Sequence, residues 1–250
     1  MNLHPRIAVS APRFSLEPFE KGLERIEKEF SVWEMITEGD LWLPSIKDGL
    51  KEIMESTTLR FSIHAQISDI NIASINPTML EASRKELKDT IGLAGELGIS
   101  PVTMHIGFIS PLTILNKDKA RSIARESLLM LDKAGEEHGV ALAAENMPRT
   151  KWAIFTDATE ILEAVEGTGI QLCFDIGHAN ISSNIDDFLP LVDIIRNIHI
   201  HDNRGKWDEH LILGQGDIDL KRVVDTLHRN YRGNWVIECT RFEGITFADQ

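Results

Sequence analysis

Apolar residues along the chain form two kinds of run, short continuous ones and longer ones with helical spacing. The short runs are rich in Val and Ile, as is typical of buried strands. They predict strands over 6–10, 31–37, 59–65, 101–106, 140–145, 170–175, 195–201 and 234–238. Between them, apolar residues recur every three or four positions, which predicts helices over 17–30, 45–56, 78–97, 117–138, 156–166, 185–192 and 219–230. Ser45 and Asn116 are the expected N-caps of two helices, and Gly98, Gly139 and Gly167 follow the ends of three.

This alternation predicts the fold class. Strands separated by helices indicate parallel pairing through crossover connections, and eight such units indicate an α/β protein with a (β/α)8 TIM barrel, formed as one domain over 1–250. Only about twelve residues follow Glu238, so the eighth helix is expected to be missing or rudimentary. A doubly wound open sheet is the alternative, but the residues after Ser10 are not the glycine-rich phosphate loop that such a sheet typically carries.

The composition bears on the partners of the protein and on its cellular location. The net charge of −13 works against nonspecific binding to nucleic acid, which needs Lys and Arg to neutralise phosphates. The two cysteines, Cys173 and Cys239, lie in apolar runs and are expected to be reduced core residues. The chain has neither an apolar run of about 18 residues nor a signal-like N-terminus, so a cytoplasmic protein without a membrane span is expected.

The stretch 197–216 is unusually dense in metal-ligand side chains. Imidazole and carboxylate groups bind zinc, manganese and iron. Alternate residues of a strand share a face, so His199 and His201 are expected to point the same way. A polar loop with surface histidines is the alternative interpretation. The ligand-type residues of the stretch are His199, His201, Asp202, Asp208 and His210.

The other strand ends carry the same chemistry. Six ligand-type residues end predicted strands, and the carboxyl ends of barrel strands converge on one face, where barrel enzymes have their active sites. Each residue alone could be a hydrogen-bonded core histidine or a helix cap. Together, four carboxylates on one face would be costly without compensating charge, which favours a bound cation. The six are His64, His105, Glu145, Asp175, His199 and Glu238, and His178, Asp208 and His210 follow in loops over the same face.

These motifs, SIHA, TMHIG, AAENMP, CFDIGH, HIHDN, DEHLILGQG and VIEC, resemble those of the xylose-isomerase-like barrel superfamily. That group contains sugar isomerases and epimerases and the endonuclease IV (family 2 apurinic endonuclease) proteins. Endonuclease IV holds three zinc ions with nine ligands, and the resemblance implies a counterpart for each: His64, His105, Glu145, Asp175, His178, His199, Asp208, His210 and Glu238. The single-metal sugar epimerases match through Glu145, Asp175, Glu238 and a strand-seven histidine, for which His199 is favoured over His201.

The chain also departs from endonuclease IV. It reads D-I-G-H over 175–178, where those proteins usually read D-T-C-H. Their longer basic loop before Asp-x-His is reduced here to NRGKW, and the Tyr near the DNA in their first motif has no counterpart. The departures favour the sugar-isomerase-like branch.

Two functions follow as hypotheses. The first is a divalent-metal-dependent isomerase or epimerase of a small sugar, polyol or sugar phosphate, with one to three ions of Zn, Mn, Mg or Co. Glu145 and Glu238 would transfer the proton through a metal-stabilised enediolate. His178 and His201 would position hydroxyls, and Arg204 would bind a phosphate or carboxylate.

The second is an endonuclease IV-like zinc phosphodiesterase that acts at abasic sites in DNA, the only interpretation with a nucleic-acid partner. A related lyase, dehydratase or hydrolase, or a noncatalytic metal-binding barrel, is a further alternative. The short tail after Glu238 would leave apolar barrel wall for a partner subunit, which suggests a homo-oligomer.

Overall fold

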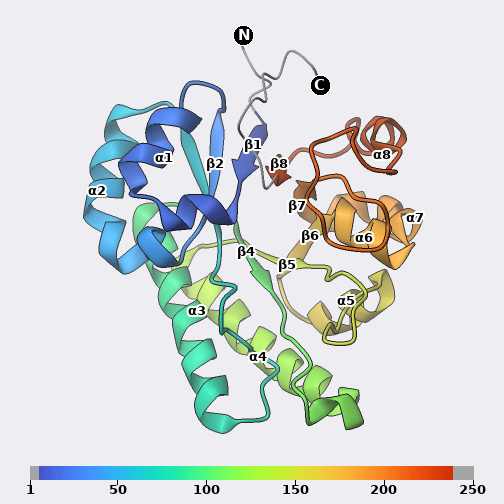
Figure 1. Cartoon of the computed structure of the whole chain (residues 1–250). Coiled ribbons are helices and arrows are strands. Elements are labelled where there is room, and N and C mark those ends of the chain that lie inside the picture. The colour runs from blue at the N-terminus through green and yellow to red at the C-terminus, as the bar shows by residue number, and fades with distance from the viewer. Residues whose placement is uncertain (1–5, 239–250) are drawn as a thin grey trace.

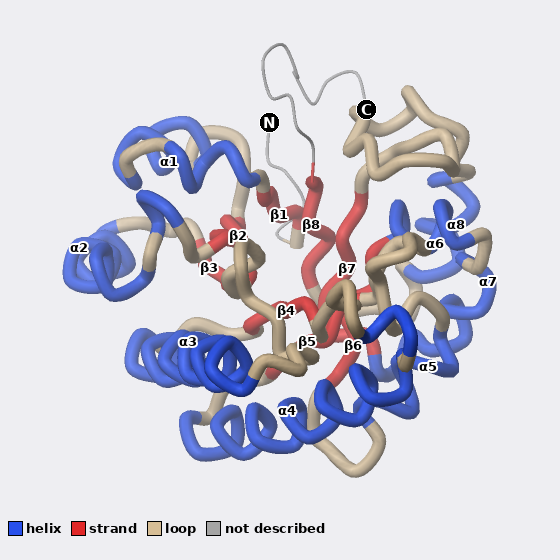
Figure 2. The backbone as a smooth tube through the Cα atoms, turned by 60° about the horizontal axis from the view of Figure 1, so that its bottom comes forward, coloured by secondary structure: helices blue, strands red, loops and turns tan. Residues whose placement is uncertain are grey.

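The strands of this protein form a closed parallel barrel. In the computed structural model, which describes residues 6–238, each strand pairs with the next along the chain, and β1 pairs with β8. Figure 2 shows the strands enclosed by the helices. The strands are β1 Ile7–Ser10, β2 Val32–Ile36, β3 Arg60–His64, β4 Val102–His105, β5 Leu142–Glu145, β6 Gln171–Asp175, β7 Ile195–Ile200 and β8 Asn234–Glu238. The closure confirms the predicted (β/α)8 barrel and excludes the open sheet.

Helices cover the outside of the barrel (Figure 1). The two longest, α3 and α4, pack against each other. Short 3-10 segments at 12–16, 39–41, 113–115 and 189–194 complete several connections. The helices are α1 Phe19–Ile26, α2 Leu43–Ser56, α3 Pro77–Leu97, α4 Lys117–His138, α5 Ala158–Val165, α6 Ile176–Ser182, α7 Ile185–Phe188 and α8 Leu220–Leu227.

The helix boundaries agree with the sequence where caps are strong. Helix α4 has the predicted bounds, because the side chain of Asn116 accepts a hydrogen bond from Lys119 N and Gly139 ends the helix with φ 67°. The N-cap predicted at Ser45 is wrong, since α2 already begins at Leu43, with Pro44 in its first turn. The first predicted helix is also too long: a 3-10 segment over 12–16 precedes Pro18, and α1 begins only after that proline.

The register of the strands places the ligand-type residues at the same height along the barrel axis. His105 lies opposite Glu145 on neighbouring strands, and Asp175 lies opposite His199. Glu238 ends β8 beside Ser10 of β1. Because all the strands are parallel, these side chains meet at a single end of the barrel.

Helix α6 was not predicted, because IGHANIS has no apolar periodicity. Asp175 caps it, accepting a hydrogen bond from His178 N. The predictions for Cys239 and for a rudimentary eighth helix fall outside the described residues, and Cys173 is buried as a free thiol.

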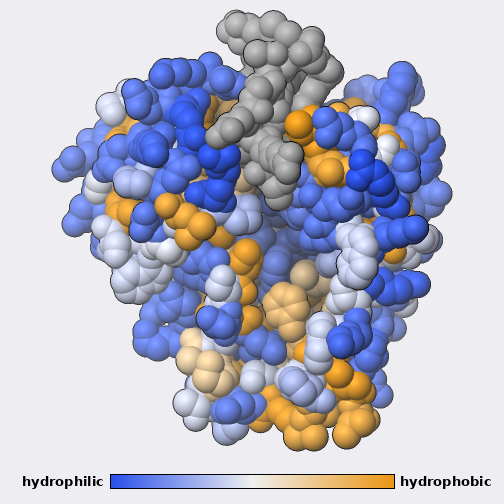
Figure 3. Space-filling model, in the orientation of Figure 1, coloured by the Kyte–Doolittle hydropathy of each residue, from blue (hydrophilic) through white to orange (hydrophobic). Residues whose placement is uncertain are grey.

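Hydrophilic side chains dominate one face of the molecule. The face drawn in Figure 3 is mostly hydrophilic, with hydrophobic side chains in separate patches. Within residues 6–238, none of the helices combines the length and apolar character needed to cross a bilayer.

Candidate metal centre and active site

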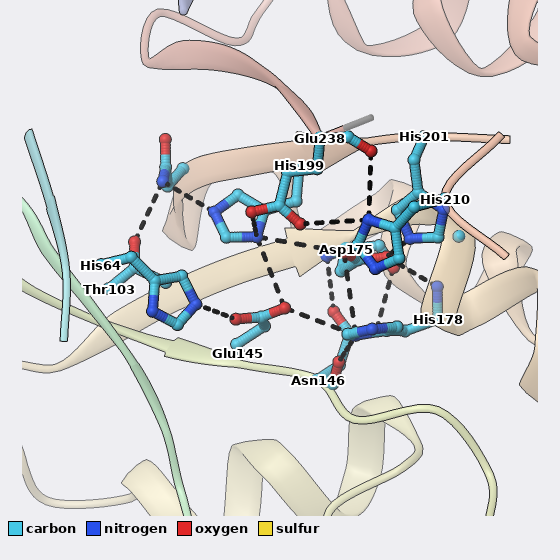
Figure 4. A network of polar contacts seen from close by, with 12 residues as sticks. His64, Thr103, Glu145, Asn146, Asp175, His178, His199, His201, His210 and Glu238 are labelled. Carbon is cyan, nitrogen blue, oxygen red and sulfur yellow. Dashed lines mark hydrogen bonds and ion pairs between the residues drawn. The ribbon is translucent and has the colours of Figure 1, made fainter. Parts of the chain in front are cut away.

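The nine side chains expected as ligands, together with His201, form one connected network at the carboxyl end of the barrel; Figure 4 labels all of them except His105 and Asp208. We divide it into three groups. The central group is Glu145, Asp175, His199 and Glu238. The loop group is His178, His201, Asp208 and His210. The β3–β4 group is His64 and His105 with the shared Glu145.

Glu145 lies between the groups. Its Oε2 is 3.1 Å from His64 Nε2 and 3.3 Å from His105 Nε2. Its Oε1 is 3.4 Å from both His178 Nδ1 and His199 Nδ1. Glu145 would therefore be shared by two cations if the central and β3–β4 groups each held one.

His199 is the imidazole of the central group. Its Nδ1 lies 3.4 Å from Glu145 Oε1, 3.4 Å from Glu238 Oε1 and 3.9 Å from Asp175 Oδ2. Glu145 is almost fully buried, whereas the side chain of Glu238 is 11% exposed. Three carboxylates therefore surround one ring nitrogen, and Glu238 is the more accessible of the two glutamates.

The loop group gathers around Asp208. Oδ2 of this carboxylate is 3.3 Å from His178 Nε2 and 3.2 Å from His210 Nε2, and Oδ1 is 3.4 Å from His201 Nε2. His178 and His201 are buried on the barrel, while Asp208 and His210 come from the loop after β7. The group therefore joins this loop to the barrel.

In three of the histidines, His64, His178 and His210, the Nδ1 atom is a hydrogen-bond donor. A carbonyl oxygen only accepts, so a nitrogen that faces one carries the proton. Nδ1 of His64 faces Ala65 O at 2.8 Å, that of His178 faces Asn146 O at 2.9 Å, and that of His210 faces Glu238 O at 3.0 Å. Their Nε2 lone pairs consequently point at carboxylate oxygens, an arrangement that requires a cation or a proton between the two atoms.

Unsatisfied buried atoms lead to the same conclusion. His199 Nδ1, His201 Nε2 and Asp175 Oδ2 are buried without a hydrogen-bond partner. Buried polar atoms are normally paired, and unpaired ones at a converging cluster indicate an ion. The donor set of imidazole and carboxylate therefore fits a divalent metal.

Charge interactions within the network raise the pKa values of histidines and lower that of Glu145. Burial alone would lower the pKa of His178, but Asp175 and Asp208 outweigh it and raise the value to about 10. Burial also opposes the charged form of His210, yet Asp208 and Glu238 raise its pKa to about 9. Burial alone would raise the pKa of Glu145, whereas the facing His199 and His105 hold it well below its usual range. These shifts favour a positive charge among the carboxylates, in the same sense as a bound cation.

Sequence reasoning missed Glu34 on β2. This fully buried carboxylate accepts from His199 Nε2 at 2.7 Å, from Asn197 Nδ2 at 2.8 Å and from Ser62 Oγ at 2.9 Å. It fixes the His199 ring so that Nδ1 faces the central group. An acidic residue in the middle of the apolar strand VWEMI was the available signal.

Two other residues lie outside the network of ligands. Asp202 is fully buried and accepts four backbone hydrogen bonds, from Asn203, Gly214, Gly216 and Ile218, so it organises the loop. The structure does not bring Arg204 to the cluster. Its exposed guanidinium pairs with Glu209 Oε1 at 2.7 Å and donates to Gln215 O, a geometry that serves the loop rather than a substrate.

Comparisons with known proteins agree with this geometry. A family model for the xylose isomerase-like TIM barrel matches residues 24–247. A solved structure of a D-tagatose 3-epimerase-like protein is 29% identical, with a TM-score of 0.88 over 95% of this chain and 91% of that one.

Among relatives, an uncharacterized protein of Methanocaldococcus jannaschii is 32% identical over 208 residues, which are 83% of this chain and 80% of the relative. A probable endonuclease 4 of Mycobacterium leprae is 25% identical over 189 residues, 69% of this chain and 70% of that protein. The chain therefore belongs to the xylose isomerase-like TIM barrel family.

Proposed function

We propose that the protein is a divalent-metal-dependent epimerase or isomerase of a small sugar or sugar phosphate. The observation that carries the proposal is the placement of Glu145 and Glu238, each 3.4 Å from His199 Nδ1, at the ends of β5 and β8. Two carboxylates that flank one ligand position can act on a substrate carbon from two sides. The likeness to a D-tagatose 3-epimerase-like protein supports this choice of chemistry.

The central group would hold the ion through Glu145, Asp175, His199 and Glu238. When bound, a divalent ion supplies a positive charge that polarises a substrate carbonyl and stabilises negative charge on its oxygen. Glu34 orients His199 from inside the barrel. The protein would thus supply ligand side chains whose positions are fixed before an ion binds.

Proton transfer falls to the two glutamates. One carboxylate removes the proton from the carbon beside the carbonyl, and the other returns a proton to the opposite face for epimerisation, or to the neighbouring carbon for isomerisation. Glu238 is the better placed to reach a substrate, because its side chain is the more exposed of the two. The hydroxyl-binding roles of His178 and His201 stay predictions, since Nε2 of both rings faces Asp208.

The rest of a substrate would use a cavity at the same end of the barrel, although none of the candidate ligand residues lines it. A cavity of about 710 Å³ opens among the loops that follow β1, β2 and β3 and the start of α3. Trp42 lines it with a partly exposed indole, whose Nε1 donates to Glu86 Oε1 at 2.9 Å, and Gln66 joins it two residues after His64. An aromatic face beside carboxylate and amide groups suits a polyhydroxylated ligand.

The second candidate is a zinc phosphodiesterase. It is favoured by the β3–β4 group, which lets Glu145 bridge two ions, and by the 25% identity to the probable endonuclease 4. It is disfavoured by the net charge of −13, which offers few phosphate contacts.

The experiment uses the full chain loaded with Mn²⁺, Co²⁺ or Zn²⁺ in deuterated water. Free ketohexoses and their phosphates are followed by proton NMR for exchange of the carbon-bound proton and for epimer formation. The proposal expects exchange in the wild type, its loss in Glu238→Gln, and full exchange in the matched control Glu137→Gln, which changes an exposed residue of α4. Zinc-dependent nicking of an abasic duplex, with no exchange on any sugar, would replace it with the second candidate.

A further inference from the structure

A cavity of about 400 Å³ lies at the amino end of the barrel. Arg60 begins β3, Gln171 begins β6 and Asn234 begins β8, and all three residues line this cavity. Alternate residues of a strand share a face, so these side chains point into the barrel, as do the candidate ligands at the far ends of the same strands. A strand of five residues is about 16 Å long, so the cavity is separate from the candidate metal centre.

The lining of this cavity is rich in positive charge. Three arginines belong to it, Arg60, Arg196 and Arg232, and we call it the arginine cavity. Of the described residues in the lining, one, Asp193, is acidic. The chain as a whole has 39 acidic and 26 basic residues, so this local excess of arginine runs against its composition. Like charges around one cavity repel each other, and an anion placed between them replaces repulsion by attraction.

An irregularity of β7 coincides with one of these arginines. Leu172 of β6 lies opposite Ile195 of β7. The next residue of β6 lies opposite Asn197, which leaves Arg196 without a counterpart on the neighbouring strand. Such a bulge bends the strand and redirects a side chain, and bulges are frequent beside functional sites. The departure from regular pairing therefore falls at a residue that lines the arginine cavity.

The turn that carries Arg232 is fixed against β7. The buried phenol of Tyr231 donates to Asn234 O at 2.6 Å and lies 3.3 Å from Arg196 O. A Cβ at Gly233 would lie 2.3 Å from Arg196 O, so the turn packs on the strand backbone to backbone. Two of the arginines are consequently carried by backbone that is in place before a ligand binds, which lowers the entropic cost of binding.

The charges of Arg196 and Arg232 are not neutralised by the part of the chain that the structure describes. Neither guanidinium forms an ion pair with a carboxylate of residues 6–238, and Nη1 of Arg232 donates to the neutral Tyr231 O at 3.0 Å. By contrast, Arg222 on α8 pairs with Asp186 Oδ1 at 2.6 Å. A guanidinium offers a planar fork of donors that fits the oxygens of phosphate.

We propose that the arginine cavity binds a phosphate group, either free or carried by a small hydroxylated monoester. A phosphate dianion matches both the charge and the forked donors of the arginines. The volume of about 400 Å³ lies within the range of small-molecule pockets and exceeds what a bare phosphate needs. Gln171 and Asn234 add amide side chains of a kind that binds hydroxyl groups. The site lies outside the metal-ligand network and does not rest on the proposed function.

The test measures binding to the full, metal-loaded chain. Calorimetric titrations use glycerol 3-phosphate, inorganic phosphate and glycerol as probes. Arg196→Gln and Arg232→Gln each remove donors to the phosphate, so each should weaken binding of glycerol 3-phosphate about 10- to 100-fold. Both substitutions change exposed side chains, so the fold is expected to be unaffected.

Arg222→Gln is the matched control, because it removes the same charge from a guanidinium that is paired on α8. It is expected to bind glycerol 3-phosphate like the wild type. A bound metal ion also attracts phosphate, so the titrations are repeated after the metal has been removed with a chelator. The affinity of the arginine cavity should not depend on the metal.

The probes also separate the two sources of the phosphate group. Tighter binding of glycerol 3-phosphate than of inorganic phosphate would assign the site to a monoester, and equal affinity would assign it to the free ion. The site would be overturned by the absence of saturable phosphate binding, or by glycerol that binds as tightly as its phosphate. Equal affinities of the wild type and both arginine variants, or binding that disappears with the metal, would overturn it as well.

Discussion

The central and loop groups lie side by side at one end of the barrel, yet they differ in both ligand chemistry and support. The central group has three carboxylates and one imidazole, and its ring is held by the carboxylate of Glu34 within the barrel. The loop group has three imidazoles and one carboxylate, and its rings are held by backbone carbonyls. Carboxylate-rich sites suit manganese or magnesium, whereas imidazole-rich sites suit zinc. The difference teaches that one connected network can offer two kinds of ligand set to a cation.

Replacing Glu238, the more accessible of the two glutamates, should have the largest effect and should act on the central group alone. Glu238→Gln keeps the side-chain shape but removes a base, so proton exchange on a sugar substrate should fall about 100- to 10,000-fold. Zinc binding to the loop group should persist. Exchange rates by NMR and metal content of the purified variant measure both; unchanged exchange would contradict the assigned role.

Metal removal should show which group stabilises the fold. An ion that binds only the folded protein, present at about 1,000 times its Kd, adds about 4 kcal/mol to the free energy of unfolding. We expect this gain for zinc in the wild type and in Glu238→Gln, and the loss of most of it in His210→Asn. Denaturant titrations with and without zinc provide the measurement, and equal gains in all three proteins would break the comparison.

Weakening the support of the central ring should have a smaller and local effect. Glu34→Gln removes the charge that orients His199, so metal affinity of the central group should fall about 10- to 100-fold. Affinity of the loop group for zinc should stay unchanged. Competitive titration with a chromogenic chelator gives both constants, and Glu137→Gln is the control; equal weakening of both groups would show a general packing defect.

The last expected effect concerns the pH dependence of stability in the metal-free protein. The folded pKa values of His178 and His210, about 10 and about 9, lie above the ordinary 6.5. Their stabilisation is therefore fully present below pH 6.5 and is lost as the pH rises through 9 and 10. The Tm should fall over this range, by about 2–4 °C for each kcal/mol lost.

Asp208→Asn is the control for this pH effect, because it removes a carboxylate that raises both pKa values, beside Asp175 for His178 and Glu238 for His210. The Tm of the variant should depend less on pH than that of the wild type. Comparing the two proteins also removes the general effect of net charge on Tm, which both share. Identical profiles for the two proteins would argue against protonated rings in the metal-free state.

The barrel and the positions of its ligands could be predicted because local signals agreed with one another. Strand β8 and helix α4 have the predicted bounds, since an apolar run and a capped amphipathic pattern depend on nearby residues only. Glu34 carried a signal, an acidic residue within an apolar strand, but its contact with His199 could not be predicted, because the two residues are 165 positions apart in the chain. Asp202 has the same chemistry as Asp208 in the same stretch, and only the path of the loop separates a backbone anchor from a candidate metal ligand.

The anchoring by Asp202 has a further consequence for metal uptake. Its carboxylate accepts from amides that span 203–218, and its backbone pairs in both directions with that of Leu211. The loop that carries Asp208 and His210 therefore has its conformational entropy removed during folding of the chain. An arriving ion does not have to order that segment, so its binding free energy is not diminished by an ordering cost. Uptake should be limited by diffusion and by the loss of water from the ion, and should resemble capture by a rigid chelator.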